Sequence, residues 1–387
     1  MNKIRLISFG LILVVILAAC QPSANNQTAK EPIKIGFVGD FSGFWSLSEK
    51  PARDGALFAV EEINKAGGVL GRQLVLDARD GQNDNALTVR LLEELINGGA
   101  VYIIGTVGDP IVAEGNIACK AGVPISTGIG SAPNLVPDMG NCAFMMIWND
   151  TIQGAAAAEH AYQQGYRTAF LLRSTEFSYV EDLPTYFGET FKHFGGEVIG
   201  EEEFRVDAGD YSAIVTTIAS LDPQPDVIYS PQINPDSVLF MRQLRAAGVV
   251  APVYTPDTND APNVLDGGAA VVNMPITTHG FPLPGSDLAA FYDKYETAKG
   301  TRPDNIFYAL GYDEIYAVKQ AIENAGSTES GELTKSLANI TNFKGITGTW
   351  SMDPKTHFAQ KPVTLIKIEN NQFVYIDTFF PEYIPAP

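Results

Sequence analysis

Residues 33–78 read IKIGFVGDFSGFWSLSEKPARDGALFAVEEINKAGGVLGRQLVLDA and contain the pattern that decides the fold. Ile33–Val38 is short and apolar, which predicts a strand. Pro51–Ala66 predicts a helix, because its small and apolar residues recur on one helical face and it opens on a proline. Gly67-Gly68 closes that helix, and Gln73–Ala78 predicts the next strand. A strand, a helix and a second strand are the first unit of a parallel sheet.

The same alternation continues to residue 126 and restarts after Asp150. The first run adds a helix at 85–97, a strand at 101–104, a helix near 110–120 and a strand at 123–126. The second run has helices near 153–164, 181–194, 211–221 and 235–247, and strands at 168–172, 197–204, 226–229 and 252–255. Helices then cover both faces of each sheet. We therefore expect an α/β fold with two doubly wound parallel-sheet lobes.

A third section begins near Pro275. It contains predicted helices at 287–299 and 306–325, and it ends in a hairpin-like pair of segments at 362–368 and 372–379. Roughly 355 residues remain after the N-terminal segment, more than the ~250 to 300 at which one core tends to divide into two domains. No repeat of solenoid period interrupts this organisation.

The N-terminus has the pattern of a bacterial lipoprotein signal. Lys3 and Arg5 precede the apolar stretch Leu6–Ala19, which is too short to span a membrane comfortably. Small residues then lead to Cys20, which resembles the lipoprotein cleavage motif. We expect residues 1–19 to be the signal peptide, Cys20 the lipid anchor and 20–31 a polar tether. The alternative is an ordinary secretory signal followed by a buried cysteine.

The chain is acidic, with 26 Lys and Arg against 45 Asp and Glu and a net charge of −19. Without Lys3 and Arg5 the mature chain would carry 24 basic and 45 acidic residues, a net charge of −21. Such a charge repels phosphate backbones and anionic lipid surfaces. We therefore expect no nucleic-acid partner and membrane attachment through the lipid anchor only.

Two further cysteines, Cys119 and Cys142, are a candidate disulfide, because an even pair in an exported chain favours one. A zinc site needs clustered ligands, and the four histidines are scattered along the sequence. Asp257, Asn259 and Asp260 could suggest calcium, but they lack the spacing of a calcium loop. We expect no metal.

No motif for catalysis is present. The sequence has no nucleophile elbow, no zinc-protease helix and no phosphate-binding loop. Gly128-Ile129-Gly130 begins like a dinucleotide fingerprint, but Pro133 stands where the third glycine is needed. We expect neither an enzyme nor a cofactor.

Short motifs in a fixed order resemble the leucine/isoleucine/valine-binding family of type I periplasmic binding proteins. The resemblance covers nearly the whole mature chain. Its motifs are Gly39-Asp40-Phe41-Ser42-Gly43, Asp54-Gly55-Ala56, residues 61–72 (EEINKAGGVLGR), Ile103-Ile104-Gly105, Val123-Pro124-Ile125-Ser126, Arg242–Gly248 and Gly311-Tyr312-Asp313.

The resemblance implies two lobes that are joined by a three-strand hinge and close on a ligand. It places 32–150 and 276–362 in the N-terminal lobe, and 151–275 and 363–387 in the C-terminal lobe.

The resemblance also indicates where the first lobe would bind a ligand. In the family, loops after the third and fourth strands hold the ligand carboxylate with hydroxyl and backbone N–H groups. These loops are 106–110 and 127–131 here, and they supply Ile129 and the hydroxyl of Ser131. The first loop departs from the family, because Asp109 and Pro110 stand near the place of a family serine.

On the facing lobe, Tyr179 matches a tyrosine of the family pocket, and Gln232 and Ile233 lie on a pocket-facing loop. Asp257 occupies the position of the carboxylate that pairs with the ligand ammonium, and Asp260 is close enough to compete for that role. Phe44 or Trp45 could cover the apolar part of the ligand, since the usual aromatic position is Ser48 here.

The expected function is that of an extracytoplasmic solute-binding lipoprotein of an ABC transporter. It would capture an amino-acid-like ligand between two lobes and deliver it, as a monomer, to a permease. One alternative is a ligand-sensing module for a separate receptor. Another is a binding protein for urea, an amide or a small aromatic acid, because fold alone does not set the ligand.

Overall fold

The computed structural model describes residues 30–108 and 110–387. Residues 31–387 form one compact unit. The predicted signal peptide, Cys20, nearly all of the predicted tether and the candidate site residue Asp109 lie outside the described residues.

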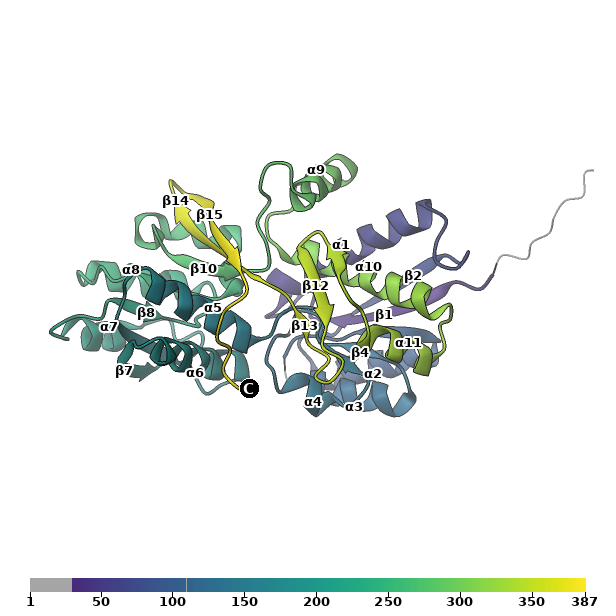
Figure 1. Ribbon diagram of the computed structural model, residues 1–387, viewed down its shortest axis with the longest axis horizontal. Coiled ribbons are helices and arrows are strands. Elements are labelled where there is room, and N and C mark those ends of the chain that lie inside the picture. Colours follow the sequence, from purple (N-terminus) through teal and green to yellow (C-terminus); the bar gives the residue numbers. More distant parts are fainter. Residues whose placement is uncertain (1–29, 109) are drawn as a thin grey trace, which may run out of the picture. The chain divides into compact units, whose positions relative to one another are not determined.

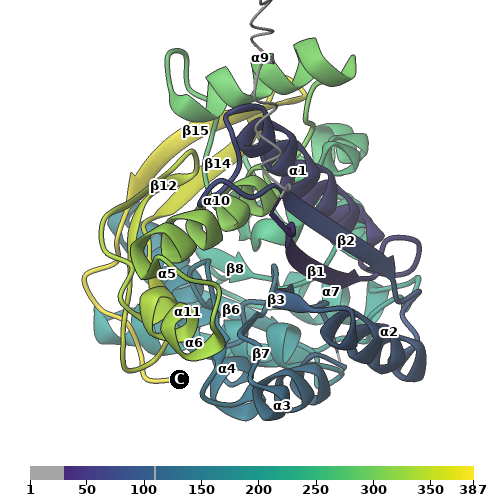
Figure 2. The ribbon, with the colours of Figure 1, turned by 90° about the vertical axis from the view of Figure 1, so that its right-hand side faces the viewer.

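The first lobe is built on a five-stranded parallel sheet with the order β2-β1-β3-β4-β5. Figure 2 shows the first helix, α1, on one side of this sheet and α2 and α3 on the other. The strands are β1 (Ile33–Gly39), β2 (Leu74–Asp80), β3 (Ala100–Ile104), β4 (Ile125–Ser126) and β5 (Ala143–Phe144). The helices are α1 (Ser46–Lys65), α2 (Asn85–Asn97), α3 (Ile111–Ala121) and α4 (Leu135–Met139).

The second lobe repeats this plan with a four-stranded parallel sheet in the order β7-β6-β8-β9. Its strands are β6 (Thr168–Arg173), β7 (Glu197–Glu203), β8 (Val227–Tyr229) and β9 (Val253–Tyr254). Its helices are α5 (Asp150–Gln163), α6 (Ser178–His193), α7 (Ser212–Ala219), α8 (Asp236–Ala246) and the 3₁₀ segments η1 (Asp257–Asn259) and η2 (Pro262–Val271).

In each sheet the first strand lies between the second and the third, so the loops at the carboxyl ends of the strands diverge on its two sides. That divergence opens a crevice where ligands bind in open α/β sheets. The predicted fold class, two doubly wound parallel-sheet lobes, is therefore confirmed.

The third section of the chain is shared between the lobes (Figure 1). β10 (Pro275–Thr278), β14 (Val363–Glu369) and β15 (Gln372–Phe379) form an antiparallel sheet, and Ile276 also bridges Thr255 after β9. The other elements contribute to the apolar core of the first lobe. They are α9 (Asp287–Lys299), α10 (Phe307–Ala325), α11 (Ser330–Ala338), β11 (Phe343–Gly345), β12 (Gly348–Met352) and β13 (Ala359–Gln360). The chain thus crosses between the lobes after β5, after β10 and after β13.

Two glycines allow α1 and α10 to pack closely against each other. A Cβ atom at Gly55 would lie 1.8 Å from the carbonyl oxygen of Tyr308, and one at Gly311 would lie 1.9 Å from that of Ala52. No side chain fits at either distance, so these glycines, which belong to the family-like motifs, set the contact between the two helices.

Some predicted boundaries were wrong, and some elements were missed. α1 begins at Ser46 rather than at Pro51, because the buried carboxylate of Asp40 accepts the N–H groups of Gly43 and Trp45 and orders the start of the helix. The sequence did not predict α4, α11, η2 or the small sheet of β11, β12 and β13, which are short and weakly periodic.

Cys119 in α3 and Cys142 before β5 form a disulfide, with Cα atoms 5.3 Å apart and a sequence separation of 23 residues. We expect its removal by a Cys119→Ser/Cys142→Ser double substitution to lower the free energy of unfolding by about 3 kcal/mol, since the unfolded chain loses a closed loop. Denaturant titration of both proteins measures the difference. Two alkylatable thiols in the denatured, unreduced wild type would contradict the pairing.

Candidate functional site

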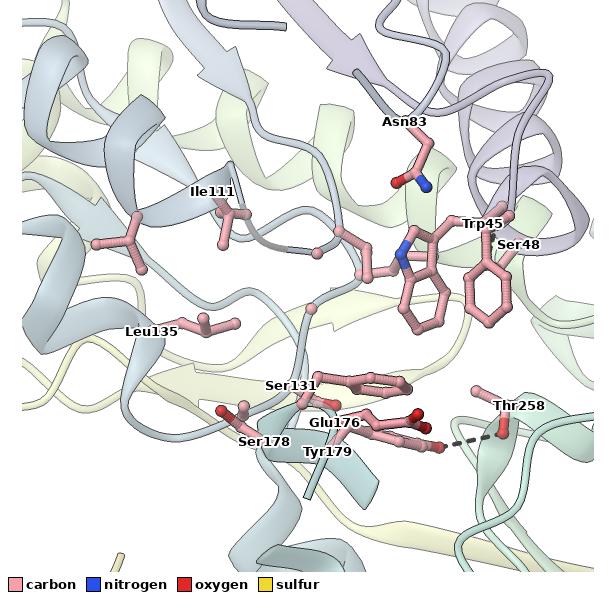
Figure 3. A pocket seen from close by; sticks show the side chains of 18 of the residues that line it. Trp45, Ser48, Asn83, Ile111, Ser131, Leu135, Glu176, Ser178, Tyr179 and Thr258 are labelled. Atoms are coloured by element: carbon pink, nitrogen blue, oxygen red, sulfur yellow. Dashed lines mark hydrogen bonds between the residues drawn. The ribbon is translucent and has the colours of Figure 1, made fainter. Parts of the chain in front are cut away.

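A cavity of about 660 Å³ lies at the carboxyl ends of the strands and is lined by both lobes. Figure 3 shows its walls, with Trp45 and Ser48 on one side and Tyr179 and Thr258 on the facing side. The first-lobe lining includes Phe44, Trp45, Ser48, Asn83, Asn85, Val107, Gly108, Ile129, Ser131, Asn134 and Phe307. The second-lobe lining is Glu176, Phe177, Ser178, Tyr179, Asp257 and Thr258.

Aromatic rings of the two lobes contact each other in this cavity. The ring of Trp45 packs edge-on against Phe44, with centroids 4.9 Å apart, and against Phe177 of the second lobe, with centroids 5.8 Å apart. Such pairs add about 0.5 to 1.5 kcal/mol beyond the area they bury. Both aromatic candidates, Phe44 and Trp45, therefore line the cavity, and the ring of Trp45 contacts the other lobe.

The polar groups of the loop after β3 point inward, toward two buried carboxyl groups. Glu49 accepts the backbone N–H of Val107 at 2.5 Å and the hydroxyl of Thr106 at 3.2 Å. Glu114 accepts the backbone N–H of Thr106 at 3.2 Å. Burial raises the pKa of Glu49 and of Glu114 to about 8.

The loop after β4 is also backed by acids. Glu314 accepts hydrogen bonds from the hydroxyls of Ser126 and Tyr102, and burial raises its pKa to about 7. Asp150, at the first residue of α5, is fully buried, which raises its pKa well above the usual range. Its backbone N–H donates to the carbonyl of Ser131 at 2.9 Å, and its Oδ1 accepts the side chain of Gln153 at 3.3 Å. One of its oxygens, Oδ2, has no hydrogen-bond partner.

Asp257 is the carboxylate at the centre of the second-lobe wall. It is 4% exposed, and it accepts the hydroxyl of Tyr179 at 2.7 Å. Its other oxygen lies 3.3 Å from Nε2 of His279, and its backbone N–H donates to the side chain of Gln153 at 3.0 Å. Burial lowers the pKa of His279 to about 4, so this imidazole is neutral at pH 7 and supplies no positive charge.

Five of the predicted site residues meet in this cavity, namely Trp45, Ile129, Ser131, Tyr179 and Asp257. The structure does not place Gln232 or Ile233 in its lining.

Both of these side chains are held inside the second lobe. The side-chain oxygen of Gln232 accepts the hydroxyl of Ser230, and its backbone carbonyl accepts the side chain of Asn259. Ile233 packs against the apolar core of the lobe. Asp260 binds the hydroxyl of Thr278 instead of facing the cavity.

Sequence reasoning missed the wall residues Glu176 and Phe177 and the support residues Glu49, Asp150 and His279. Glu176 and Phe177 lie on the loop after β6, which ends at Arg173, so their place beyond the carboxyl end of a strand was a usable signal. Glu49 supports Thr106, which is 57 residues away, and His279 contacts Asp257, which is 22 residues away, and no local pattern reveals these contacts.

Within 30–108 and 110–387, no group of three or more His, Cys, Asp or Glu side chains could hold a metal ion. Asp257 and Asp260, considered for calcium, bind protein hydroxyl groups instead. The helices of the described residues also include none with the length and apolar character of a membrane-spanning segment.

We expect the free energy of unfolding to fall as the pH rises from about 6.5 to 8. Glu49, Glu114, Glu314 and Asp260 have folded-state pKa values of about 7 to 8, above their unfolded values. The stability that they contribute is full below the unfolded pKa and is lost as the pH rises through the folded pKa. Each of these carboxyl groups lowers the free energy of unfolding by at most about 1.4 kcal/mol per pH unit.

Denaturant titration across this pH range measures the trend. Glu49→Gln, which cannot ionise, should make it shallower. An unfolding free energy that rises with pH over this interval would contradict the expectation.

Residues 32–372 match the sequence model of a family described as periplasmic binding protein. A leucine-, isoleucine-, valine-, threonine- and alanine-binding protein of Pseudomonas aeruginosa is 25% identical over 335 residues, which cover 86% of this chain and 88% of the relative.

Solved structures agree with that match. The leucine-binding protein LivK of Thermotoga maritima has a TM-score of 0.81 and 26% identity, covering 90% of this chain and 99% of its own. A benzoate-bound solute-binding protein of an ABC transporter from R. palustris has a TM-score of 0.78 and covers 92% of this chain and 98% of its own. At 19% identity it shows the fold alone. These relatives are binding proteins, as expected for a chain that is not an enzyme.

Proposed function

The chain belongs to the periplasmic binding protein family, as the sequence motifs indicated, and we propose that it is the solute-binding component of an ABC transporter. In this role it encloses a small ligand between its lobes outside the cytoplasm and delivers it to a permease. One observation carries the proposal. The main cavity is lined by both lobes, so a ligand in it gains contacts from each lobe when they close.

We propose that the N-terminal lobe consists of residues 32–150 and 276–362. The C-terminal lobe then consists of residues 151–275 and 363–387. The three crossings after β5, β10 and β13 support a hinge near these limits. The pairing of β10 with β14 suggests that the second crossing lies beyond Thr278.

The ligand of the proposal is a small molecule with a positively charged end. Asp257 and Tyr179 receive that end, and Trp45, Phe44 and Phe177 cover its apolar part. Relatives that bind leucine and other branched amino acids support an amino-acid-like ligand. An aromatic acid such as benzoate is less well supported, because the described lining contains no Lys, Arg or His to neutralise it.

A thermal-shift screen of amino acids, amides, amines and aromatic acids tests the proposed function. A ligand at 100 times its Kd stabilises the folded state by about 2.7 kcal/mol. Small-angle scattering should then show a more compact protein for the compounds that raise Tm. If no compound in these classes raises Tm, the solute-binding proposal is wrong.

We also propose that the mature chain is held at the membrane by a lipid on Cys20. We expect Cys20→Ala to abolish lipid attachment and to release the protein from the membrane fraction, because the thioether to the lipid can no longer form. Mass spectrometry of the natural N-terminus measures this. An unmodified mature N-terminus downstream of Cys20 would contradict it.

A further inference from the structure

The cavity carries negative charge without a compensating positive group. Among its described lining residues there are two acids, Asp257 and Glu176, and no Lys, Arg or His. The guanidinium of Arg205 lies 3.9 Å from Glu176, but it is 85% exposed and lies outside the lining. An exposed pair of this kind is worth little. A ligand carboxylate would therefore enter a site whose own charges repel it.

In the loop after β3, the donors that would hold such a carboxylate are already in use. The hydroxyl of Thr106 and the N–H of Val107 donate to Glu49, and the N–H of Thr106 donates to Glu114. The chain's own carboxyl groups, Glu49 and Glu114, thus take up these donors behind the loop after β3.

Asp257, in contrast, would gain from a positively charged ligand group. It is 4% exposed, and His279 is its one ion-pair partner within the described residues. His279 is neutral at pH 7, so the hydrogen bonds from Tyr179 and His279 come from uncharged groups. A buried carboxylate with neutral donors only gains strongly when a cation arrives.

The aromatic side chains that line the cavity also favour binding of a cation. Trp45 and Phe177 line the cavity beside Tyr179, which donates to Asp257. The faces of aromatic rings attract ammonium groups, and this attraction grows when water is excluded.

Resting on the proposed binding function, we propose that the ligand is a cationic amine without a carboxylate, for example an amine or an amino-acid amide. Its ammonium binds Asp257, and its apolar body lies against Trp45 and Phe177. The amide side chains in the cavity, Asn83, Asn85 and Asn134, offer neutral contacts for its other end.

Matched trios of compounds test this inference directly. Phenylalanine, phenylalaninamide and phenethylamine share one apolar body, as do leucine, leucinamide and 3-methylbutylamine, and only the first of each trio has a carboxylate. We expect titration calorimetry at pH 7 to give the amide or the amine of the better trio an affinity about 10- to 100-fold higher than that of the amino acid.

The outcomes separate this inference from the proposed function. An amino acid or benzoate that binds at least as tightly as every amide and amine would overturn the inference and leave the solute-binding function in place. No heat and no rise in Tm with any cationic, zwitterionic or anionic compound would overturn both.

A substitution in the first lobe tests the preference for a ligand without a carboxylate independently. Glu49→Ala frees the hydroxyl of Thr106 and the N–H of Val107, so we expect the ratio of amide affinity to amino-acid affinity to fall about tenfold. Glu62→Ala is the matched control, because it removes a carboxylate of the same helix that pairs with Lys294 outside the cavity lining, and it should leave the ratio unchanged. An unchanged ratio in a folded Glu49→Ala protein would overturn the part assigned to Glu49. If that variant does not fold, the wild-type ratio decides.

Discussion

Asp257→Ala is expected to weaken binding of an ammonium-bearing ligand more than a hundredfold. Asp257 is 4% exposed and receives only neutral donors from the chain, Tyr179 and His279, so its charge is free to pair with the ligand. Removing one partner of a buried charge pair costs about 3 to 5 kcal/mol. Titration calorimetry of wild type and variant with the tightest ligand from the compound screen measures the change.

Two further variants serve as controls for this result. Asp266→Ala removes an exposed carboxylate of the same lobe, so its affinity should equal that of the wild type. Asp260→Asn tests the competing carboxylate, which binds Thr278 and does not line the cavity, and its affinity should change only a few-fold. If Asp257→Ala keeps wild-type affinity, Asp257 lies outside the binding site and a ligand held by its ammonium is excluded.

The fold could be predicted because the alternation of strands and helices is a local property of the sequence. Ile33–Gly39 and Thr168–Arg173 are apolar strands followed by helices of clear period, and two such runs define two parallel sheets. Short pieces such as α11 carry too few residues for a period to emerge.

The site could be predicted only in part, for a physical reason. Asp257 and Ser131 lie on the loops after β9 and β4, and the carboxyl ends of parallel strands face the crevice. Gln232 also follows a strand, yet its side chain turns inward to Ser230, because sequence position does not specify the direction of a loop side chain. Glu49 supports the loop after β3 across 57 residues, and a contact at that separation exists only after folding.

The largest expected effect on stability is at Asp313, the acidic residue of the Gly311-Tyr312-Asp313 motif. Its carboxylate accepts the backbone N–H groups of Ile346 and Thr347 at 2.8 and 3.0 Å. The hydroxyl of Thr347 also donates to it and accepts the ammonium of Lys361 at 2.5 Å. Lys361 is 1% exposed and lies at the third crossing between the lobes, so Asp313 supports a buried charge near the hinge.

We expect Asp313→Ala to lower the free energy of unfolding by about 3 to 5 kcal/mol, because it leaves Lys361 buried without a carboxylate and two N–H groups without an acceptor. Burial already lowers the pKa of Lys361 to about 8, and the attraction of Asp313 opposes that shift. Asp313→Ala/Lys361→Met removes both charges and should recover part of the loss, whereas Asp293→Ala, which breaks an exposed pair with Arg302, should cost less than about 1 kcal/mol. Denaturant titration of the four proteins measures these differences. Equal losses in Asp313→Ala and Asp293→Ala would show that the carboxylate of Asp313 does not stabilise the buried ammonium of Lys361.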